Sequence, residues 1–248
     1  IGFDRVGDGD VVLILHGLFG SRDNWKGISR DLASDYTVIS IDLPSHGDSL
    51  NISPINYKSL AETLQPFIRE NISSPATLLG HSMGGKTSMQ LVHDFPELFS
   101  KLIVADIAPK PYPPHHQDIL EGLAAVNLED IQSRSDADTL LANYIDAPST
   151  RSFLLKSLKK TDLGFEWKFD LDQIIVDYDN IADCPILTHK STLPTLFLRG
   201  SQSNYIQDQD RPLLQKFFPN ATLDTVEKAG HWLHAEQPQQ VLEKIKQF

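Results

Sequence analysis

The sequence predicts an α/β protein with a mostly parallel, doubly wound sheet, built from 248 residues. Short apolar runs with β character alternate along the chain with stretches whose apolar residues recur at helical spacing. The runs are apolar at nearly every position, which is typical of strands buried on both faces of a parallel sheet. Polar residues follow directly after several runs, at the edge where such sheets bind ligands.

The first part of the chain supplies four central strands in order. An opening segment contains the end of a strand and a turn rich in Gly and Asp. Predicted strands then occupy residues 11–15, 36–41, 76–79 and 101–105. Between them the periodicity predicts helices near 25–32, 57–70 and 83–93. Pro66 predicts a kink or a break in the second helix.

The strand pattern then stops for about 85 residues, from 109 to 193. This segment opens with four prolines and predicts helices near 117–126, 136–146 and 149–160, with a short strand or extended stretch at 165–169. Its size indicates a helical lid over the open end of the sheet, inserted between late strands, and not a separate domain. Residues 1–108 and 194–248 then form the core. The later part adds strands at 194–198 and 222–226 and helices near 208–217 and 238–248.

Composition excludes several classes of function. Acidic residues outnumber basic ones 33 to 22, for a formal net charge of −11, so nucleic acid is not an expected partner. Cys184 is the single cysteine, which excludes an intrachain disulfide and a cysteine-rich metal site. No apolar run approaches the 18 residues or so of a membrane span. We expect a cytoplasmic location, or a mitochondrial one if a presequence preceded Ile1.

A serine between two glycines lies where a strand gives way to a helix. Gly80-His81-Ser82-Met83-Gly84 fits the G-x-S-x-G pattern of a nucleophile elbow. The turn is so sharp that a Cβ two residues to either side of Ser82 would collide with the strand or the helix. The hydroxyl is therefore held at the tip of a turn, beside helix N–H groups that favour negative charge.

A serine nucleophile needs a base, and the base needs a carboxylate to orient it. His231 follows a strand and a glycine and is the preferred base, with His234 as its competitor. Asp106 stands at the end of the strand after the nucleophile helix, from which a carboxylate can reach the histidine. Asp208 and Asp210 are alternatives, although capping of a helix N-terminus would also explain them.

Taken together, several ordered motifs resemble the α/β-hydrolase superfamily and, within it, the small YbfF-type esterases and their mitochondrial abhydrolase relatives. These motifs are His16–Gly20, Asp42-x-x-x-His46-Gly47-x-Ser49, Gly80–Gly85, Asp106–Pro109 and Gly230–Glu236. In many such enzymes the acid follows the penultimate strand, a position that Ser203 occupies in this chain. The resemblance instead implies Asp106 as the acid and Ser203 as its hydrogen-bonding support. It also implies short-chain ester substrates, and acyl-CoA as a further class.

The other residues near the predicted site are expected to bind the oxyanion through the backbone, to stabilise loops or to pack in the core. Two backbone N–H groups, those of Leu18 and Met83, are the expected oxyanion donors, because such donors must point to where negative charge develops. His16, Asp42 and His46 are expected to stabilise loops, and Lys86 has no catalytic role that the sequence justifies. The His115-His116 doublet is expected to be solvent-exposed and to form only a weak metal site. Core packing is the default for the lid residues that could also line an acyl pocket: Tyr112, Phe153, Trp167 and Phe169.

The resulting hypothesis is a cofactor-free and metal-free serine carboxylesterase that acts on small to medium acyl esters or thioesters. Ser82 would accept the acyl group, His231 would move the proton, and water would release the acid. Two alternatives keep the scaffold but change the function. One is a lyase, haloperoxidase or C–C bond hydrolase, and the other is a ligand-binding protein with a vestigial pocket. Dehalogenase and epoxide hydrolase chemistry is disfavoured, because those relatives carry Asp at the position of Ser82.

Overall fold

The computed structural model describes residues 1–162 and 164–248. Across these residues seven strands form one sheet, in the spatial order β1-β3-β2-β4-β5-β8-β9. All neighbouring strands are parallel except β1, which pairs antiparallel with β3. The strands are β1 Phe3–Val6, β2 Val11–Leu15, β3 Thr37–Ile41, β4 Ala76–His81, β5 Phe99–Ala105, β8 Thr195–Gly200 and β9 Ala221–Val226. The mostly parallel, doubly wound sheet predicted from the sequence is confirmed.

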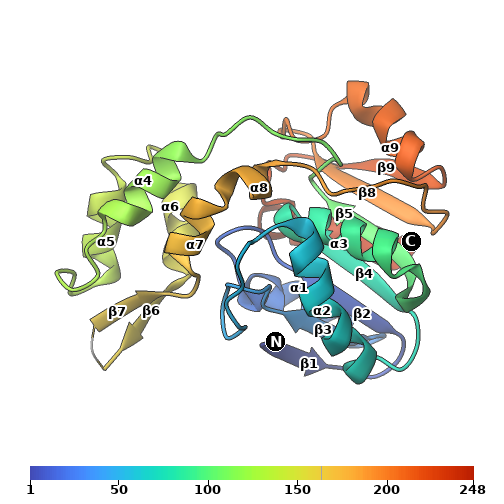
Figure 1. The fold of residues 1–248 in the computed structure, drawn as a ribbon, viewed down its shortest axis with the longest axis horizontal. Coiled ribbons are helices and arrows are strands. Elements are labelled where there is room, and N and C mark those ends of the chain that lie inside the picture. Colours follow the sequence, from blue (N-terminus) through green and yellow to red (C-terminus); the bar gives the residue numbers. More distant parts are fainter. Residues whose placement is uncertain (163) are drawn as a thin grey trace.

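Helices cover both faces of this sheet (Figure 1). Strand side chains alternate between two buried clusters, so that Leu13 and Val104 point to one face, whereas Val12 and Ile103 point to the other. The first cluster contains residues of α2 (Tyr57–Asn71), α3 (Met83–Asp94) and α9 (Arg211–Phe217). The second contains residues of α1 (Lys26–Leu32) and α11 (Pro238–Gln247). The five inner strands β2, β3, β4, β5 and β8 are therefore largely buried on both sides, as their apolar runs require, whereas the edge strands β1 and β9 are partly exposed.

The chain leaves the sheet after β5 and returns to it at β8. We call the intervening residues 109–193 the insertion. It contains α4 Gln117–Ala125, α5 Arg134–Leu141, α6 Pro148–Leu155, the hairpin of β6 Leu158–Thr161 and β7 Gly164–Trp167, α7 Leu171–Val176 and α8 Tyr178–Ala182. In Figure 1, α4 to α7 and the hairpin form a group to one side of the sheet, and α8 lies between that group and the core.

Three local predictions are wrong. The helix expected over 149–160 ends at Leu155, because Leu158–Thr161 pairs with the strand Gly164–Trp167 as a hairpin. The helix expected over 136–146 spans Arg134–Leu141, since the Ser133 side chain caps it by accepting from the Asp136 N–H. Of the kink or break expected at Pro66, the break does not occur, because α2 continues through Pro66 to Asn71. No helix among the described residues is long and apolar enough to span a bilayer.

Candidate active site

Ser82 stands at the junction of β4 and α3 in a strained backbone conformation, with φ 53° and ψ −119°. The flanking glycines permit this turn. A Cβ on Gly80 would overlap the carbonyl oxygen of Gly84, and a Cβ on Gly84 would overlap that of His16 at the end of β2. The crowding predicted for the two glycines is therefore confirmed, and it fixes Ser82 against the end of the neighbouring strand.

The structure brings Ser82, His231 and Asp106 together, although they lie far apart in the sequence. The Ser82 hydroxyl donates to His231 Nε2 at 3.0 Å, and His231 Nδ1–H donates to Asp106 Oδ2 at 2.8 Å. Asp106 follows β5 directly, and Ser82 follows β4, the strand paired with β5. This hydrogen-bonded chain is the arrangement in which a histidine can take a proton from serine while a carboxylate holds its tautomer.

Two further donors hold the Asp106 carboxylate, which has no solvent-exposed surface. The Ser203 hydroxyl donates to Oδ2 at 2.5 Å, and the Gly200 N–H donates to Oδ1 at 3.0 Å. Burial raises the pKa of Asp106 above its ordinary value, and these two donors oppose that shift by favouring the carboxylate. Ser203 thus contacts Asp106 as the resemblance implied.

Burial, together with the nearby His115, lowers the pKa of His231. The imidazole is therefore neutral in the resting site, with Nε2 free to accept the serine proton. Tyr205 stacks on this ring with the two centroids 3.8 Å apart and an angle of 17° between the ring planes, which restrains the orientation of the imidazole. His81 adds a second restraint, because its Nε2–H donates to the His231 carbonyl at 2.8 Å.

The competing candidates for base and acid lie in other environments. His234 stacks on Trp25 at 4.4 Å, as expected for a packing residue. Asp210 accepts two hydrogen bonds from the Lys110 ammonium, each at 2.7 Å, and also binds the Gln207 N–H. Asp208 is exposed and pairs with Arg199 and Arg211. Neither carboxylate contacts His231.

The two expected oxyanion donors both belong to residues close to Ser82. Met83 is the first residue of α3, and Leu18 follows Gly17, where a Cβ would come within 3.2 Å of the Ser82 Cβ. Among residues 1–162 and 164–248, neither the Leu18 nor the Met83 backbone N–H has a hydrogen-bond partner. Both are therefore available to bind a negatively charged oxygen next to Ser82.

Two buried histidines fix the loop that carries Leu18. His16 Nδ1–H donates to the Gly17 carbonyl at 2.7 Å, and Nε2 accepts from the Leu43 N–H at 2.9 Å. His46 uses the same tautomer, since its Nδ1–H donates to the Pro44 carbonyl and its Nε2 accepts from the Phe19 N–H at 3.3 Å. The pKa falls to about 4 for His16 and about 3 for His46, with burial as the main cause. Their predicted structural role is confirmed.

Asp42 stabilises the adjacent turn, as expected. Its carboxylate accepts from the Arg22 N–H and the Asp48 N–H, and it pairs with the Arg22 guanidinium. These bonds tie the segment after β3 to the loop after β2.

Two cavities of about 40 Å³ each flank Ser82, and they differ in chemistry. The Lys86 cavity lies along α3, and the His231 cavity lies beside the imidazole. The Lys86 cavity is lined by Leu18, Tyr57, Ser82, Met83, Lys86, Ile107, Tyr112, His115, His116, Tyr178, Ile181, Ala182 and Tyr205. The His231 cavity is lined by Gly17, Leu18, Phe19, His81, Ser82, His116, Ile119, Thr150, Phe153, Leu154, His231 and Trp232.

The insertion contributes to both cavities. Tyr112 lines the first and Phe153 the second, and both also pack against the core, which was the default expected for them. His116 lines both, and its expected full exposure is wrong: its Nδ1 bonds to the Tyr178 hydroxyl at 2.8 Å, and burial lowers its pKa to about 3. His115 is exposed, as predicted.

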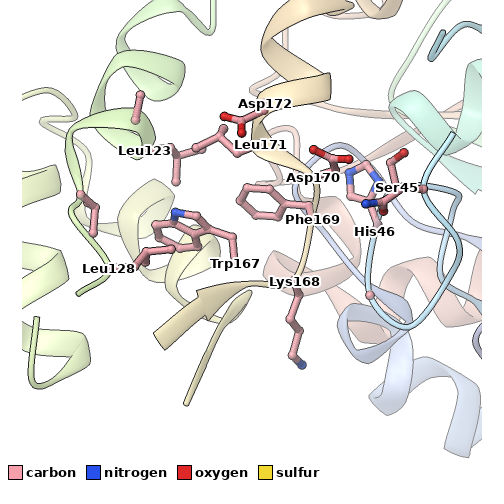
Figure 2. A pocket seen from close by; sticks show the side chains of 14 residues that line it. Ser45, His46, Leu123, Leu128, Trp167, Lys168, Phe169, Asp170, Leu171 and Asp172 are labelled. Carbon is pink, nitrogen blue, oxygen red and sulfur yellow. The ribbon is translucent and has the colours of Figure 1, made fainter. Parts of the chain in front are cut away.

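A much larger cavity, about 500 Å³, lies between the insertion and the loop that follows β3 (Figure 2). Trp167 and Phe169 stack there with their ring centroids 5.5 Å apart, facing Leu123 and Leu128, whereas Lys168 points the opposite way. Neither Ser82 nor His231 lines this cavity. Trp167 and Phe169 are therefore not part of the lining at Ser82.

Comparison with known proteins agrees with this geometry. Residues 10–238 match the family described as alpha/beta hydrolase fold. Esterase YbfF of Escherichia coli is 34% identical over 96% of this chain and 92% of its own length. The mouse sn-1-specific diacylglycerol lipase ABHD11 is 32% identical over 97% of this chain and 82% of its own.

A solved marine microorganism esterase superposes with a TM-score of 0.96 at 38% identity, covering 99% of this chain and 98% of that one. Both the sequence relatives and this structure are named for the cleavage of esters. The chain therefore belongs to the α/β hydrolase family, and it is a hydrolase that acts on esters.

Proposed function

We propose that the chain is a serine carboxylesterase in which Ser82, His231 and Asp106 act as a catalytic triad on small acyl esters. The observation that carries this proposal is the unbroken hydrogen-bonded chain from the Ser82 hydroxyl through His231 to a buried carboxylate. A neutral His231 accepts the serine proton as the hydroxyl oxygen attacks the ester carbonyl. The Leu18 and Met83 N–H groups then bind the oxyanion of the tetrahedral intermediate.

In this proposal, the role of His231 determines which part of the substrate occupies each cavity. The imidazolium must return its proton to the departing alkoxide, so the alcohol has to lie on the His231 side. The carbonyl oxygen occupies the space near the Leu18 and Met83 N–H groups. The acyl chain then extends along α3 into the Lys86 cavity. Both cavities are small, which favours short acyl groups and small alcohols.

In the second half of the reaction, water takes the place of the alcohol. His231 removes a proton from this water, the hydroxide attacks the acyl-enzyme, and Ser82 recovers its proton as the acid leaves. The insertion acts as a lid in this scheme, because Tyr112, Phe153 and His116 close the space over Ser82.

The direct test compares hydrolysis of nitrophenyl acetate, butyrate and octanoate by the wild type and by Ser82→Ala. Activity should fall about 10⁴- to 10⁶-fold in the variant, the scale seen when a triad serine is removed. A fluorophosphonate should label the wild type on the peptide that contains Ser82. Ser74→Ala, an exposed serine outside the site, is the matched control and should retain activity and labelling. Wild-type protein that neither turns over these esters nor reacts with the fluorophosphonate would contradict the proposal.

A further inference from the structure

Lys86 carries a buried ammonium group in the wall of the Lys86 cavity, and the catalytic scheme does not use this group. The residue lies one helical turn beyond Ser82 in α3, and its backbone N–H donates to the Ser82 carbonyl at 3.0 Å. Only 2% of its surface is exposed. An aliphatic side chain would suit this position on packing grounds, and a buried charge is costly unless it is compensated. Its presence therefore requires a reason.

The neighbours of Lys86 compensate its charge only in part. Nζ donates to the carbonyl of Ala182 at 3.1 Å and to that of Asp183, both at the end of α8. It also lies 4.8 Å from the ring centre of Tyr112 and 5.4 Å from that of Tyr57. In the described part of the chain, no carboxylate lies within ion-pair distance of Nζ. None of the side chains that line the cavity is acidic.

The tyrosine hydroxyls around the cavity are already engaged. The Tyr57 hydroxyl donates to the Ile181 carbonyl, and the Tyr112 hydroxyl donates to the Tyr205 carbonyl at 2.6 Å. The Tyr178 hydroxyl bonds to His116. An ammonium has three N–H donors, and the two carbonyls of α8 use two of them. Among the described residues, the third donor has no hydrogen-bond partner, and it belongs to a group that lines the same cavity as Ser82.

We propose that Lys86 binds a carboxylate at the far end of the acyl chain, so that the preferred substrates are monoesters of short dicarboxylic acids. The inference rests on the proposed function, since it needs the acyl chain to occupy the Lys86 cavity. The substrate carboxylate supplies the direct ion-pair partner that none of the described residues provides, and a charge-assisted hydrogen bond replaces the hydration lost on entry. The small cavity keeps the distance from the ester carbon to the carboxylate short.

The alternative is that Lys86 only ties α8 to α3. The two carbonyl contacts alone would satisfy that role. The enzyme would then accept acyl chains that end in a charged or an uncharged group equally well. Substrate selectivity separates the two interpretations. Monoethyl succinate ends in a carboxylate, whereas ethyl 4-methylpentanoate has an isopropyl group of the same shape at that position.

We expect the wild type to prefer monoethyl succinate in kcat/KM by roughly 10- to 100-fold, the range for a hydrogen bond to a charged group. Lys86→Met should abolish this ratio or invert it, and Lys86→Arg should retain most of it. Lys110→Met is the matched control, because Lys110 pairs with Asp210 and does not line the cavity. A wild-type ratio of one or below, or an unchanged ratio in Lys86→Met, overturns the inference.

A measurement on the wild type covers the case in which Lys86→Met does not fold. Burial lowers the pKa of Lys86 to about 8, with Cys184 and Asp183 opposing the shift. Tyr57, Tyr112, Cys184 and His116 stay neutral near that pH, since burial raises the pKa of the first three and lowers that of His116. The preference for monoethyl succinate should therefore decline as the pH rises through about 8, and a constant preference contradicts the assignment. If the wild type hydrolyses ethyl 4-methylpentanoate and Ser82→Ala does not, the esterase proposal holds even when the preference for monoethyl succinate is absent. If neither ester is hydrolysed, both the esterase proposal and the inference about Lys86 are overturned.

Discussion

The core and the insertion contribute to one site by different physical means. At the sheet edge, Ser82, Asp106 and Gly200 follow or end three neighbouring parallel strands, and buried hydrogen bonds fix their positions to within a narrow range. The insertion reaches the same place through side chains such as Tyr112 and Phe153, which form walls and contact no reacting atom. The difference indicates that changes among the hydrogen-bonded residues at the sheet edge should alter the rate of the chemistry, whereas changes in the cavity walls, to which the insertion contributes, should alter the choice of substrate.

The largest effect should come from the core carboxylate. Asp106→Asn should lower kcat for nitrophenyl butyrate about 10⁴-fold, because an amide stabilises the wrong tautomer of the histidine. Ser203→Ala, which removes one donor to Asp106, should cost roughly 10-fold. Asp210→Asn is the control, since this carboxylate pairs with Lys110 and not with His231. A folded Asp106→Asn enzyme within a few fold of the wild type would exclude Asp106 as the acid.

A second effect concerns the stability of the core near the oxyanion loop. His46 has a folded pKa of about 3, below its ordinary value, so the unfolded chain binds more protons as the pH falls below about 6.5. The contribution of neutral His46 to the free energy of unfolding is therefore complete above that pH. It decreases on acidification by about 1.4 kcal/mol per pH unit. His46→Gln keeps an acceptor for the Phe19 N–H but does not titrate. Urea unfolding at pH 7, 6 and 5 should show the stability difference between wild type and variant shrinking at each step; parallel curves would contradict this account.

The smallest effect should come from the insertion. Phe153 packs on Trp232 with centroids 5.1 Å apart and lines the His231 cavity. Phe153→Ala should raise kcat/KM for benzyl acetate relative to methyl acetate by roughly 5- to 10-fold, because it widens the alcohol side by several carbon atoms. Acyl-chain preference should not change. Leu140→Ala, an exposed position of α5 that lines neither cavity, provides the comparison. A uniform loss for all esters would show instead that Phe153 supports the catalytic geometry.

The same division explains what the sequence could predict. The strands, the elbow at Ser82 and the placement of His231 and Asp106 follow from local signals: apolar runs, paired glycines and polar residues at strand ends. The loop roles of His16 and His46 were also accessible, because they lie in short motifs next to those strands. Lys86 was visible as a helix residue, but nothing in its neighbourhood along the chain indicated burial against α8, which lies almost 100 residues later.

The insertion was less predictable for the same reason. Its helices are short, and its order comes from contacts with distant segments, such as the bond between Gly47 and Lys168 and that between Asp170 and Ser45. The hairpin of β6 and β7 replaced a predicted helix end because cross-strand pairing outweighed helical periodicity. Tyr205 was missed because stacking on a histidine leaves no pattern in the sequence.

The contact of Tyr112 with Tyr205 has a consequence for chimeric enzymes. The Tyr112 hydroxyl belongs to the insertion, and it anchors the backbone of the core loop whose Tyr205 ring lies flat on His231. Transplanting a foreign insertion at residues 109–193 would remove that anchor and release the ring that steadies the general base. An exchange intended to change specificity would then also reduce turnover, unless the loop at 203–206 were transferred together with its new partner.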